Sequence, residues 1–307
     1  MSKPENAAWS DFWARESAGA QGGGCLPQGW ATIEAAQKRA WHDVIRNSRK
    51  GARVLDLATG DGRVLRWLRA ARPDLKLFGV DAAPALPAAP KGCKVRAGVR
   101  MEQLPFADGA FDFVTSQFGF EYGEVERVAG EAARVLVPGG TLALMVHRGD
   151  GPILAHNLKR RNGISWALEE RKVLEIARGA LAFPAASNFA LQRLAAVAAE
   201  GARLFGRASP AWEITEAARQ TLTLGLQRDP ASIGATLAVL RERAGNEIAR
   251  IDSLERACAM ADDRRNLLRA LAAAGLRERG TTVVAEPSKE AFADLIVLTK
   301  SAQIEMK

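Results

Sequence analysis

Short apolar runs alternate with amphipathic stretches over the first half of the chain. Residues 53–57 form an apolar run that stops at a Gly-containing turn, and residues 63–73 follow with apolar positions at helical spacing. This pattern predicts a strand followed by a helix. Further strands are predicted at 75–80, 94–99, 111–116 and 141–146, with a helix at 123–137 and a turn at 138–140. Strands and helices in alternation predict a parallel α/β sheet that is covered on both faces.

The pattern changes after about residue 150. Residues 151–270 are rich in Ala, Leu and Arg, have helical periodicity and contain no convincing strand. Prolines interrupt this block, which predicts three or four helices. The longest is expected at 232–275, with candidate breaks at Gly245 and Asp262.

Strand signals return near the C-terminus, at 280–285 and 292–299. The helical block is therefore expected to interrupt a sheet that these two strands complete. The expected organisation is an N-terminal helical segment and candidate lid at 1–50, a sheet domain at 51–150 and 271–307, and a helical insertion at 151–270.

Composition places the chain among ordinary globular proteins. Of its 307 residues, 48% are hydrophobic and 25% are charged, which argues against intrinsic disorder and a fibrous architecture. No apolar run reaches the 18 or more residues of a membrane-spanning helix, and the polar, Gly-rich start does not resemble a secretory signal. We therefore expect a cytoplasmic protein.

The charge excess is modest and spread along the chain. Lys and Arg number 43 against 35 Asp and Glu, giving a net charge of +8, which suits a nucleic acid, an anionic substrate or an anionic membrane surface. With a single Tyr there is little aromatic material for stacking on bases, so a nucleic-acid substrate is not expected. Cys25, Cys93 and Cys258 are far apart, which predicts neither a disulfide framework nor a metal site.

The turn after the first predicted strand is the most informative segment. Residues 54–62 read VLDLATGDG, and Asp81 ends the next predicted strand. Small residues after a strand let the backbone approach a ligand, the next helix offers free N–H groups, and the acid can accept both ribose hydroxyls. This favours a nucleotide-type cofactor, with a purely structural turn as the alternative. A dehydrogenase is disfavoured because Leu65 stands where the third glycine belongs, and the P-loop ending of Gly-Lys-Ser/Thr is absent.

Four segments follow in order along residues 50–147: DLATGDG at 56–62, Asp81, LPFADGAFD at 104–112 and RVLVPGG at 134–140. Together they resemble the class I S-adenosylmethionine-dependent methyltransferases, in the branch of the ubiquinone/menaquinone C-methyltransferases (methyltransferase type 11). The resemblance implies an α/β fold: a doubly wound, mostly parallel seven-stranded sheet with an antiparallel last strand. The helical block would then be an insertion between strands 5 and 6.

The same resemblance implies S-adenosyl-L-methionine as the cofactor and methyl transfer to a small-molecule acceptor at oxygen, nitrogen or carbon. An RNA or protein methyltransferase remains an alternative, and so does a cofactor-binding protein without transfer activity. The implied cofactor-binding residues are Asp56, Ala58, Thr59, Gly60, Gly62, Asp81, Ala82, Met101, Glu102, Gln117 and Phe118.

Two positions depart from the family pattern. Ala58 stands where the first glycine usually stands, and Arg100 stands where an acidic residue commonly meets the adenine amino group. Adenine recognition would then depend on the backbone around Met101 and on Glu102.

Methyl transfer requires an in-line approach to an activated carbon, and a base only when the acceptor must lose a proton. His147 follows the fifth predicted strand, at the carboxyl edge where open α/β sheets bind ligands, so it is a candidate base or substrate contact. Glu121 and Tyr122 are alternatives. A structural role is open for all three.

Two further segments have open roles. The aromatic residues Trp9, Phe12, Trp13 and Trp30 form either a lid over the cofactor or a helix packed on the sheet. The helical block is either a substrate cover or, through the apolar side of 232–261, a homodimerisation element.

Overall fold

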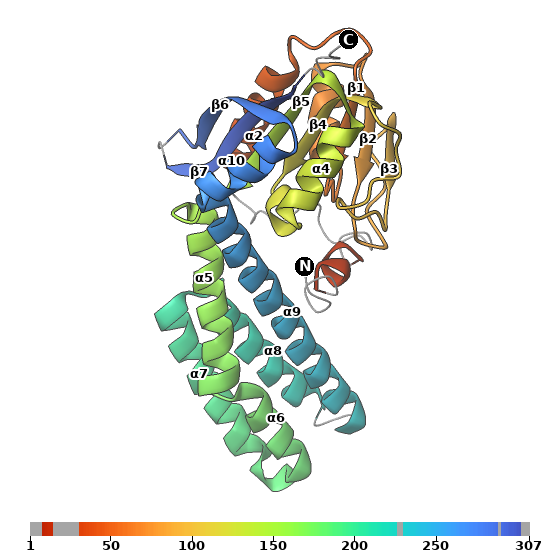
Figure 1. Ribbon diagram of the computed structural model, residues 1–307. Coiled ribbons are helices and arrows are strands. Elements are labelled where there is room, and N and C mark those ends of the chain that lie inside the picture. The colour runs from red at the N-terminus through yellow and green to blue at the C-terminus, as the bar shows by residue number, and fades with distance from the viewer. Residues whose placement is uncertain (1–7, 15–30, 226–229, 288–289, 302–307) are drawn as a thin grey trace, which may run out of the picture. The chain divides into compact units, whose positions relative to one another are not determined.

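The computed structural model describes residues 8–14, 31–225, 230–287 and 290–301 (Figure 1). Cys25 and Trp30 lie outside these residues. The chain divides into two compact units. The first, here called the sheet unit, comprises residues 1–154 and 253–307, and the second, the helical unit, comprises residues 155–252.

The sheet unit contains one seven-stranded sheet in the order β3-β2-β1-β4-β5-β7-β6. All neighbouring strands are parallel except β7, which pairs antiparallel with both β5 and β6. This arrangement confirms the expected fold class. The strands are β1 (Arg53–Leu57), β2 (Lys76–Val80), β3 (Cys93–Arg96), β4 (Phe111–Gln117), β5 (Leu136–His147), β6 (Leu276–Ala285) and β7 (Ala291–Lys300).

The strand order reverses between β1 and β4, because the chain moves outward through β2 and β3 on one side and through β4 and β5 on the other. Open α/β sheets bind ligands outside the carboxyl ends of the strands at such a reversal. The turn after β1 and the segment after β4 therefore flank the expected binding position.

Helices cover the sheet. The helices α4 and α10 contact each other in front of the strands in Figure 1, and α2 and α3 also contact each other. Fully buried side chains between strands and helices include Leu55, Phe111 and Leu142. The helices of this unit are α2 (Ala31–Ile45), α3 (Arg63–Ala71), a 3-10 turn η1 (Phe120–Tyr122), α4 (Val125–Val135), the end of α9 and α10 (Arg264–Ala273), and residues 8–14 are also helical.

One detail of the sheet differs from the sequence prediction. Residues 138–140, predicted as a turn, lie within β5, which begins at Leu136. The ladder starts early because Leu136 pairs with Phe111 and the register then shifts before Phe113. A bulge of this kind accommodates the Pro-Gly-Gly residues without ending the strand.

The helical unit has its own apolar core, which includes Trp166, Leu174, Leu194 and Leu222. Its helices are the main part of α5 (Pro152–Ser165), a π-helical turn η2 (Trp166–Glu170), α6 (Val173–Ala182), a 3-10 turn η3 (Pro184–Ala186), α7 (Ser187–Phe205), α8 (Pro210–Gly225) and most of α9 (Pro230–Asp262).

The prediction of three or four helices after residue 150 is wrong, because the described residues from 152 to 273 form six α-helices. Helix α9 continues through Gly245, where a helical glycine costs only about 1 kcal/mol. The break at Asp262 is confirmed, and the carboxylate of Asp263 caps α10 by accepting the N–H of Asn266. Since α10 lies in the sheet unit, the helical unit is shorter than the expected insertion at 151–270.

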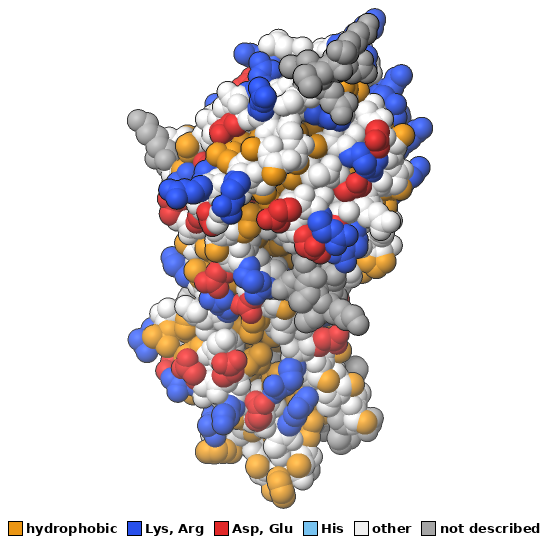
Figure 2. All heavy atoms as spheres, in the orientation of Figure 1, with side chains coloured by type: hydrophobic (Ala, Val, Ile, Leu, Met, Phe, Trp, Pro, Cys, Tyr) orange, Lys and Arg blue, Asp and Glu red, His pale blue; other side chains and the backbone are white. Residues whose placement is uncertain are grey.

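Positive and negative side chains are interspersed on the face drawn in Figure 2, as the dispersed charge in the sequence predicts. Among the described helices, we find none with the length and apolar character needed to cross a membrane.

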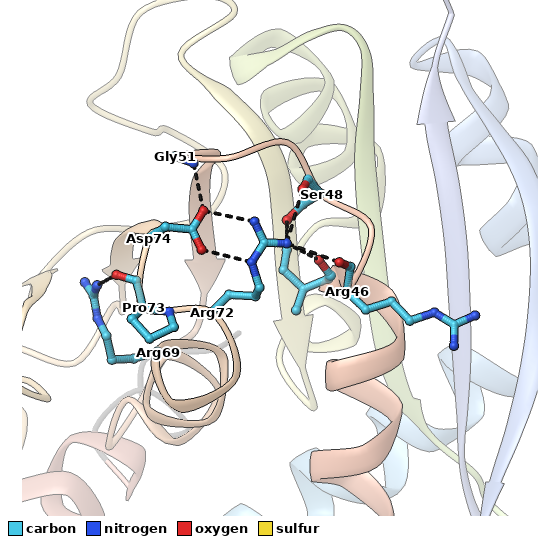
Figure 3. Close-up of polar contacts among 8 residues, drawn as sticks. Arg46, Ser48, Gly51, Arg69, Arg72, Pro73 and Asp74 are labelled. Atoms are coloured by element: carbon cyan, nitrogen blue, oxygen red, sulfur yellow. Dashed lines mark hydrogen bonds and ion pairs between the residues drawn. The ribbon is translucent and has the colours of Figure 1, made fainter.

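An ion pair ties the amino edge of the sheet together (Figure 3). The guanidinium of Arg72 makes two 2.9 Å bonds to the carboxylate of Asp74, which also accepts the N–H of Gly51 at 2.9 Å. The same guanidinium donates to the carbonyl of Ser48, at 3.1 Å. The bonds from Arg72 and Gly51 hold the pKa of Asp74 well below its usual value, so this acid stabilises the fold as an anion.

Candidate active site at the carboxyl edge of the sheet

The turn between β1 and α3 has an unusual backbone. Ala58, Gly60 and Gly62 have φ values of 51°, 50° and 69°, in the left-handed region. The N–H of Gly60 donates to Asp81 Oδ2 at 2.9 Å, which ties the turn to the end of β2. Left-handed backbone at Ala58 is costly for a residue with a Cβ, and such strain clusters at functional sites.

Two buried acids lie at this edge. Asp81 is 8% exposed and also accepts the N–H of Ala83 at 2.9 Å, and burial raises its pKa. Asp56 is 1% exposed and accepts the hydroxyl of Thr115 at 2.8 Å. Burial raises the pKa of Asp56 to about 7. Carboxylates that are costly to ionise in the free protein are suited to a ligand that brings positive charge or hydroxyl donors.

The segment after β4 lies directly against the glycine turn. A Cβ on Gly119 would come within 2.4 Å of the Cβ of Ala58, so there is no room for a side chain at this position. The hydroxyl of Ser116 donates to the carbonyl of Leu57 at 3.2 Å and accepts the N–H of Phe120 at 3.0 Å. These bonds fix the ends of β1 and β4 and the start of the turn η1.

The turn η1 brings Glu121 to the end of β5. Glu121 Oε1 lies 2.8 Å from Nδ1 of His147 and also accepts the backbone N–H of His147 at 3.0 Å. Both side chains are buried, at 0% and 7% exposure for Glu121 and His147. The second carboxylate oxygen, Oε2, is buried and has no hydrogen-bond partner among the described residues. In the tautomer in which Nδ1 donates to this carboxylate, Nε2 keeps its lone pair.

Aromatic rings enclose the imidazole of His147. The ring of Phe118 stacks on it with centroids 4.1 Å apart, and Tyr122 approaches edge-on at 6.0 Å. Tyr122 in turn meets Trp9, 5.8 Å away, from the N-terminal helical segment. The structure therefore brings together the three catalytic candidates His147, Glu121 and Tyr122, which the sequence offered as alternatives.

Cys258, on the last turns of α9, lies in the same region. Burial raises the pKa of its thiol to about 12, and the charge of Glu121 adds to the effect. The thiol therefore stays protonated at neutral pH and is not suited to act as a nucleophile.

Gln117 ends β4 and contacts two residues that the sequence analysis missed. Its side-chain oxygen accepts the indole N–H of Trp41 at 2.6 Å, and its amide donates to Gln37 at 3.4 Å. Both partners are fully buried on α2. Helical spacing of Ile33, Gln37 and Trp41 could have indicated one buried face, but no sequence signal links that face to β4.

The remaining predicted cofactor residues have other partners. The carboxylate of Glu102 accepts the N–H of Glu124 at 3.3 Å and lies 3.4 Å from the guanidinium of Arg100. Met101 packs against the apolar core of the sheet unit, and Ala82 is exposed. Contact of these residues with adenine stays a prediction.

The N-terminal helical segment covers the glycine turn. A Cβ on Gly60 would lie 2.4 Å from the indole ring of Trp13, so the ring rests on the bare backbone at this point. Phe12 lies between Trp9 and Trp13 in an edge-to-face series, with centroids 5.7 Å and 5.0 Å apart. The lid role of this segment stays a prediction. In the part of the chain that the structure describes, no group of three or more His, Cys, Asp or Glu is arranged to hold a metal ion.

Comparison with known proteins gives consistent results. Residues 55–144 match the profile of a family described as a methyltransferase domain. A demethylmenaquinone methyltransferase of Thermus thermophilus is 39% identical over 101 residues, which are 30% of this chain and 46% of that protein. A demethylmenaquinone methyltransferase of Thermotoga maritima is 36% identical over 115 residues, which are 36% of this chain and 48% of that protein. The chain spans about half the length of these relatives.

Among solved structures, geranyl diphosphate C-methyltransferase from Streptomyces coelicolor aligns over 98% of this chain and 100% of its own, with 12% identity and a TM-score of 0.47.

Proposed function

We propose that this chain, whose residues 55–144 match the profile of a methyltransferase domain, is a class I S-adenosylmethionine-dependent methyltransferase that transfers a methyl group to a weakly acidic small molecule. The observation that carries the proposal is the buried Glu121–His147 pair, which stands at the carboxyl edge of the sheet beside the glycine turn. Such a pair is a positioned base, and a methyltransferase requires a base only for an acceptor that must lose a proton.

The residues at the turn fit the cofactor. S-adenosylmethionine supplies a methyl group already activated on a sulfonium. Asp81 offers a buried carboxylate to a ribose diol, and Asp56 offers a second one to a cationic group. The hydroxyl of Thr59 is buried beside the Asp56 carboxylate, where its hydrogen bond lowers the pKa of that acid.

In the proposed mechanism, Glu121 is a positioning residue. Its carboxylate accepts a hydrogen bond from the N–H at Nδ1 of His147, which directs the lone pair of Nε2 toward the acceptor. The same carboxylate stabilises the imidazolium that forms when Nε2 takes a proton. The stacked ring of Phe118 restricts rotation of the imidazole and excludes water. Bound at the glycine turn, S-adenosylmethionine would supply the methyl group and leave as S-adenosylhomocysteine when the S–CH3 bond breaks. The residues named here would orient the deprotonated acceptor in line with that bond, and orientation would contribute much of the rate.

The acceptor class follows from this chemistry. A phenol, enol or hydroquinone becomes a good oxygen or carbon nucleophile once a histidine removes its proton. The matched relatives are demethylmenaquinone methyltransferases, which supports an aromatic hydroquinone as the first acceptor to try. The anion formed by proton loss also agrees with the expected anionic acceptor.

The test measures cofactor binding and transfer separately. Calorimetry with S-adenosylhomocysteine should give binding to the wild type, and a labelled methyl group should pass from S-adenosylmethionine to a naphthohydroquinone or phenol. The variant His147→Gln should lose about 10²–10⁴-fold in transfer rate while keeping its cofactor affinity. Glu121→Gln should lose less rate and change the pH profile of transfer. His42→Gln is the matched control, because His42 is exposed on α2.

Distinct results would contradict distinct parts of the proposal. Full transfer activity in His147→Gln would show that His147 is not the base. If the labelled methyl group appears on RNA or protein and not on small molecules, the acceptor is RNA or protein. Cofactor binding without transfer to any acceptor indicates a binding protein, and absence of binding rejects the assignment as a whole.

A further inference from the structure

The helical unit carries an exposed aromatic pair at the turn between α6 and α7. Phe183 is 73% exposed and Phe189 is 68% exposed, and neither belongs to the apolar core of the unit. In Figure 2 hydrophobic side chains gather at the lower end of this unit, where Figure 1 labels α6. Two aromatic rings exposed within seven residues represent apolar surface that the fold itself does not use.

Unpaired positive charge flanks the two rings. Arg178 and Arg193 are both exposed, and the sequence has no acidic residue between Glu175 and Glu200. Arg193 lies four residues after Phe189, on the same face of α7. Neither arginine has an ion pair within the described ranges. Among the described residues, Arg203, Arg207 and Arg243 also have no ion pair. Five other arginines of the unit are paired, namely Arg160, Arg161, Arg171, Arg219 and Arg241.

We infer that this turn, here called the aromatic turn and defined by Arg178, Phe183, Phe189 and Arg193, docks on an anionic lipid surface. Phenylalanine rings enter the apolar boundary of a bilayer, and arginines beside them meet the phosphate groups of the lipid heads. Both kinds of side chain are exposed around the short connection between α6 and α7, where a lipid surface can reach them.

A second copy of the chain fits this turn less well. A two-fold contact places a patch against itself, so Arg178 and Arg193 would face their own copies. The segment from 176 to 199 holds no carboxylate to neutralise them, and like charges brought together are repelled. An anionic lipid surface offers the opposite charge.

The experiment measures co-sedimentation of the full chain with vesicles. One set contains phosphatidylglycerol and phosphatidylcholine in equal parts, and the other contains phosphatidylcholine alone. The wild type should bind the anionic vesicles, and about 0.5 M NaCl should weaken this binding at least severalfold. The double variant Phe183→Ser with Phe189→Ser should bind at least about tenfold more weakly.

Two further variants complete the test. Arg178→Gln with Arg193→Gln should also bind at least about tenfold more weakly, since it removes two cations next to the surface. Leu224→Ser is the matched control, because Leu224 is 68% exposed on α8 and should bind like the wild type. All these sites are exposed, so the variants should keep the wild-type melting temperature.

Three results would overturn the inference: equal binding to both kinds of vesicle, equal loss in the Leu224→Ser control, and no binding by the wild type at low salt. A dimer mass in solution that becomes a monomer mass in the Phe183→Ser, Phe189→Ser variant would assign the turn to self-association. The test needs neither cofactor nor acceptor, so its outcome is independent of the proposed function.

Discussion

The sheet unit and the helical unit bury different kinds of polar group. At the carboxyl edge of the sheet the buried groups include carboxylates and an imidazole, of which Asp56, Asp81, Glu121 and His147 are each at most 8% exposed. In the helical unit the buried polar residues are hydroxyls that bond to nearby carbonyls. Thr215, for example, donates to Ala211 at 2.7 Å, one helical turn earlier. Buried ionisable groups are costly unless they are paired or a ligand or reaction uses them, which agrees with our proposal that the sheet unit holds the reacting groups.

The two units also differ in how many large hydrophobic side chains they expose, and here the helical unit has more. Six large hydrophobic side chains are exposed in the described part of the chain. Five of these lie in the helical unit, and only Val283 lies in the sheet unit. Together the two differences suggest that one unit holds the reacting groups and the other presents a surface for binding. The substrate-cover and dimerisation roles expected for the helical block stay predictions.

The strongest test of this division between the two units is a substitution at a single glycine of the sheet unit. Gly119→Val would press a side chain against Ala58, where no space exists. We expect a loss of stability on the order of 1–3 kcal/mol and, in addition, a loss of S-adenosylhomocysteine binding, because the glycine turn must move. Thermal melts and calorimetry measure the two effects.

Gly179→Ala is the counterpart in the helical unit. A Cβ on Gly179 meets nothing within 4 Å, so the change should raise helix stability by up to about 1 kcal/mol and leave cofactor binding unchanged. Cofactor binding that survives Gly119→Val, or that falls in Gly179→Ala, would contradict the division between the units.

A second comparison lies within the sheet unit. Asp74 and Asp81 each accept a backbone N–H, at opposite edges of the sheet. Asp81→Ala should weaken S-adenosylhomocysteine binding by on the order of 2–3 kcal/mol, since charge-assisted bonds to the ribose are lost. Asp74→Ala should lower the melting temperature without changing affinity. Equal affinities of the two variants in calorimetry would remove Asp81 from the cofactor site.

A further expected effect concerns the pH dependence of stability. Because burial raises the pKa of Asp56 from 3.8 to about 7, its protonated form stabilises the fold. This contribution is fully present below about pH 3.8 and is lost as the pH rises through about 7. Between about pH 5 and pH 7 the free energy of unfolding should fall by on the order of 1–2 kcal/mol.

Asp56→Asn removes this titration and should flatten the profile, which denaturant unfolding at several pH values can measure. The variant keeps the neutral shape of the side chain, so it should remain folded. An unchanged slope would mean that Asp56 is already ionised in the free protein.

Much of the sheet could be predicted from local pattern. The strand at 53–57 and the helix after it follow from apolar spacing, and the structure places β1 at Arg53–Leu57 and α3 at Arg63–Ala71. The turn and Asp81 could be predicted as neighbours because adjacent parallel strands bring their carboxyl ends to one edge. The number of helices was predicted wrongly where no strong signal marks an end: Pro184 separates α6 from α7, but no proline stands between α5 and α6.

The contact between Glu121 and His147 shows what local sequence pattern cannot predict. Glu121 and His147 are 26 residues apart, and each was recognised separately as a candidate. Their meeting depends on the parallel pairing of Gln117 with Met145 and on the short turn that follows β4. The contact between Trp41 and Gln117, 76 residues apart, is of the same kind.

The sequence by itself determined the type of sheet, the glycine turn and the acid at the end of the second strand, because these features follow from residue types and spacing along a few neighbouring positions. Only the tertiary structure decided that Glu121 contacts His147, that Gly119 must lack a side chain, and that Arg178 and Arg193 have no ion pair among the described residues. These relations join residues from different elements, and their distances depend on strand register and helix packing, which no local stretch of sequence encodes.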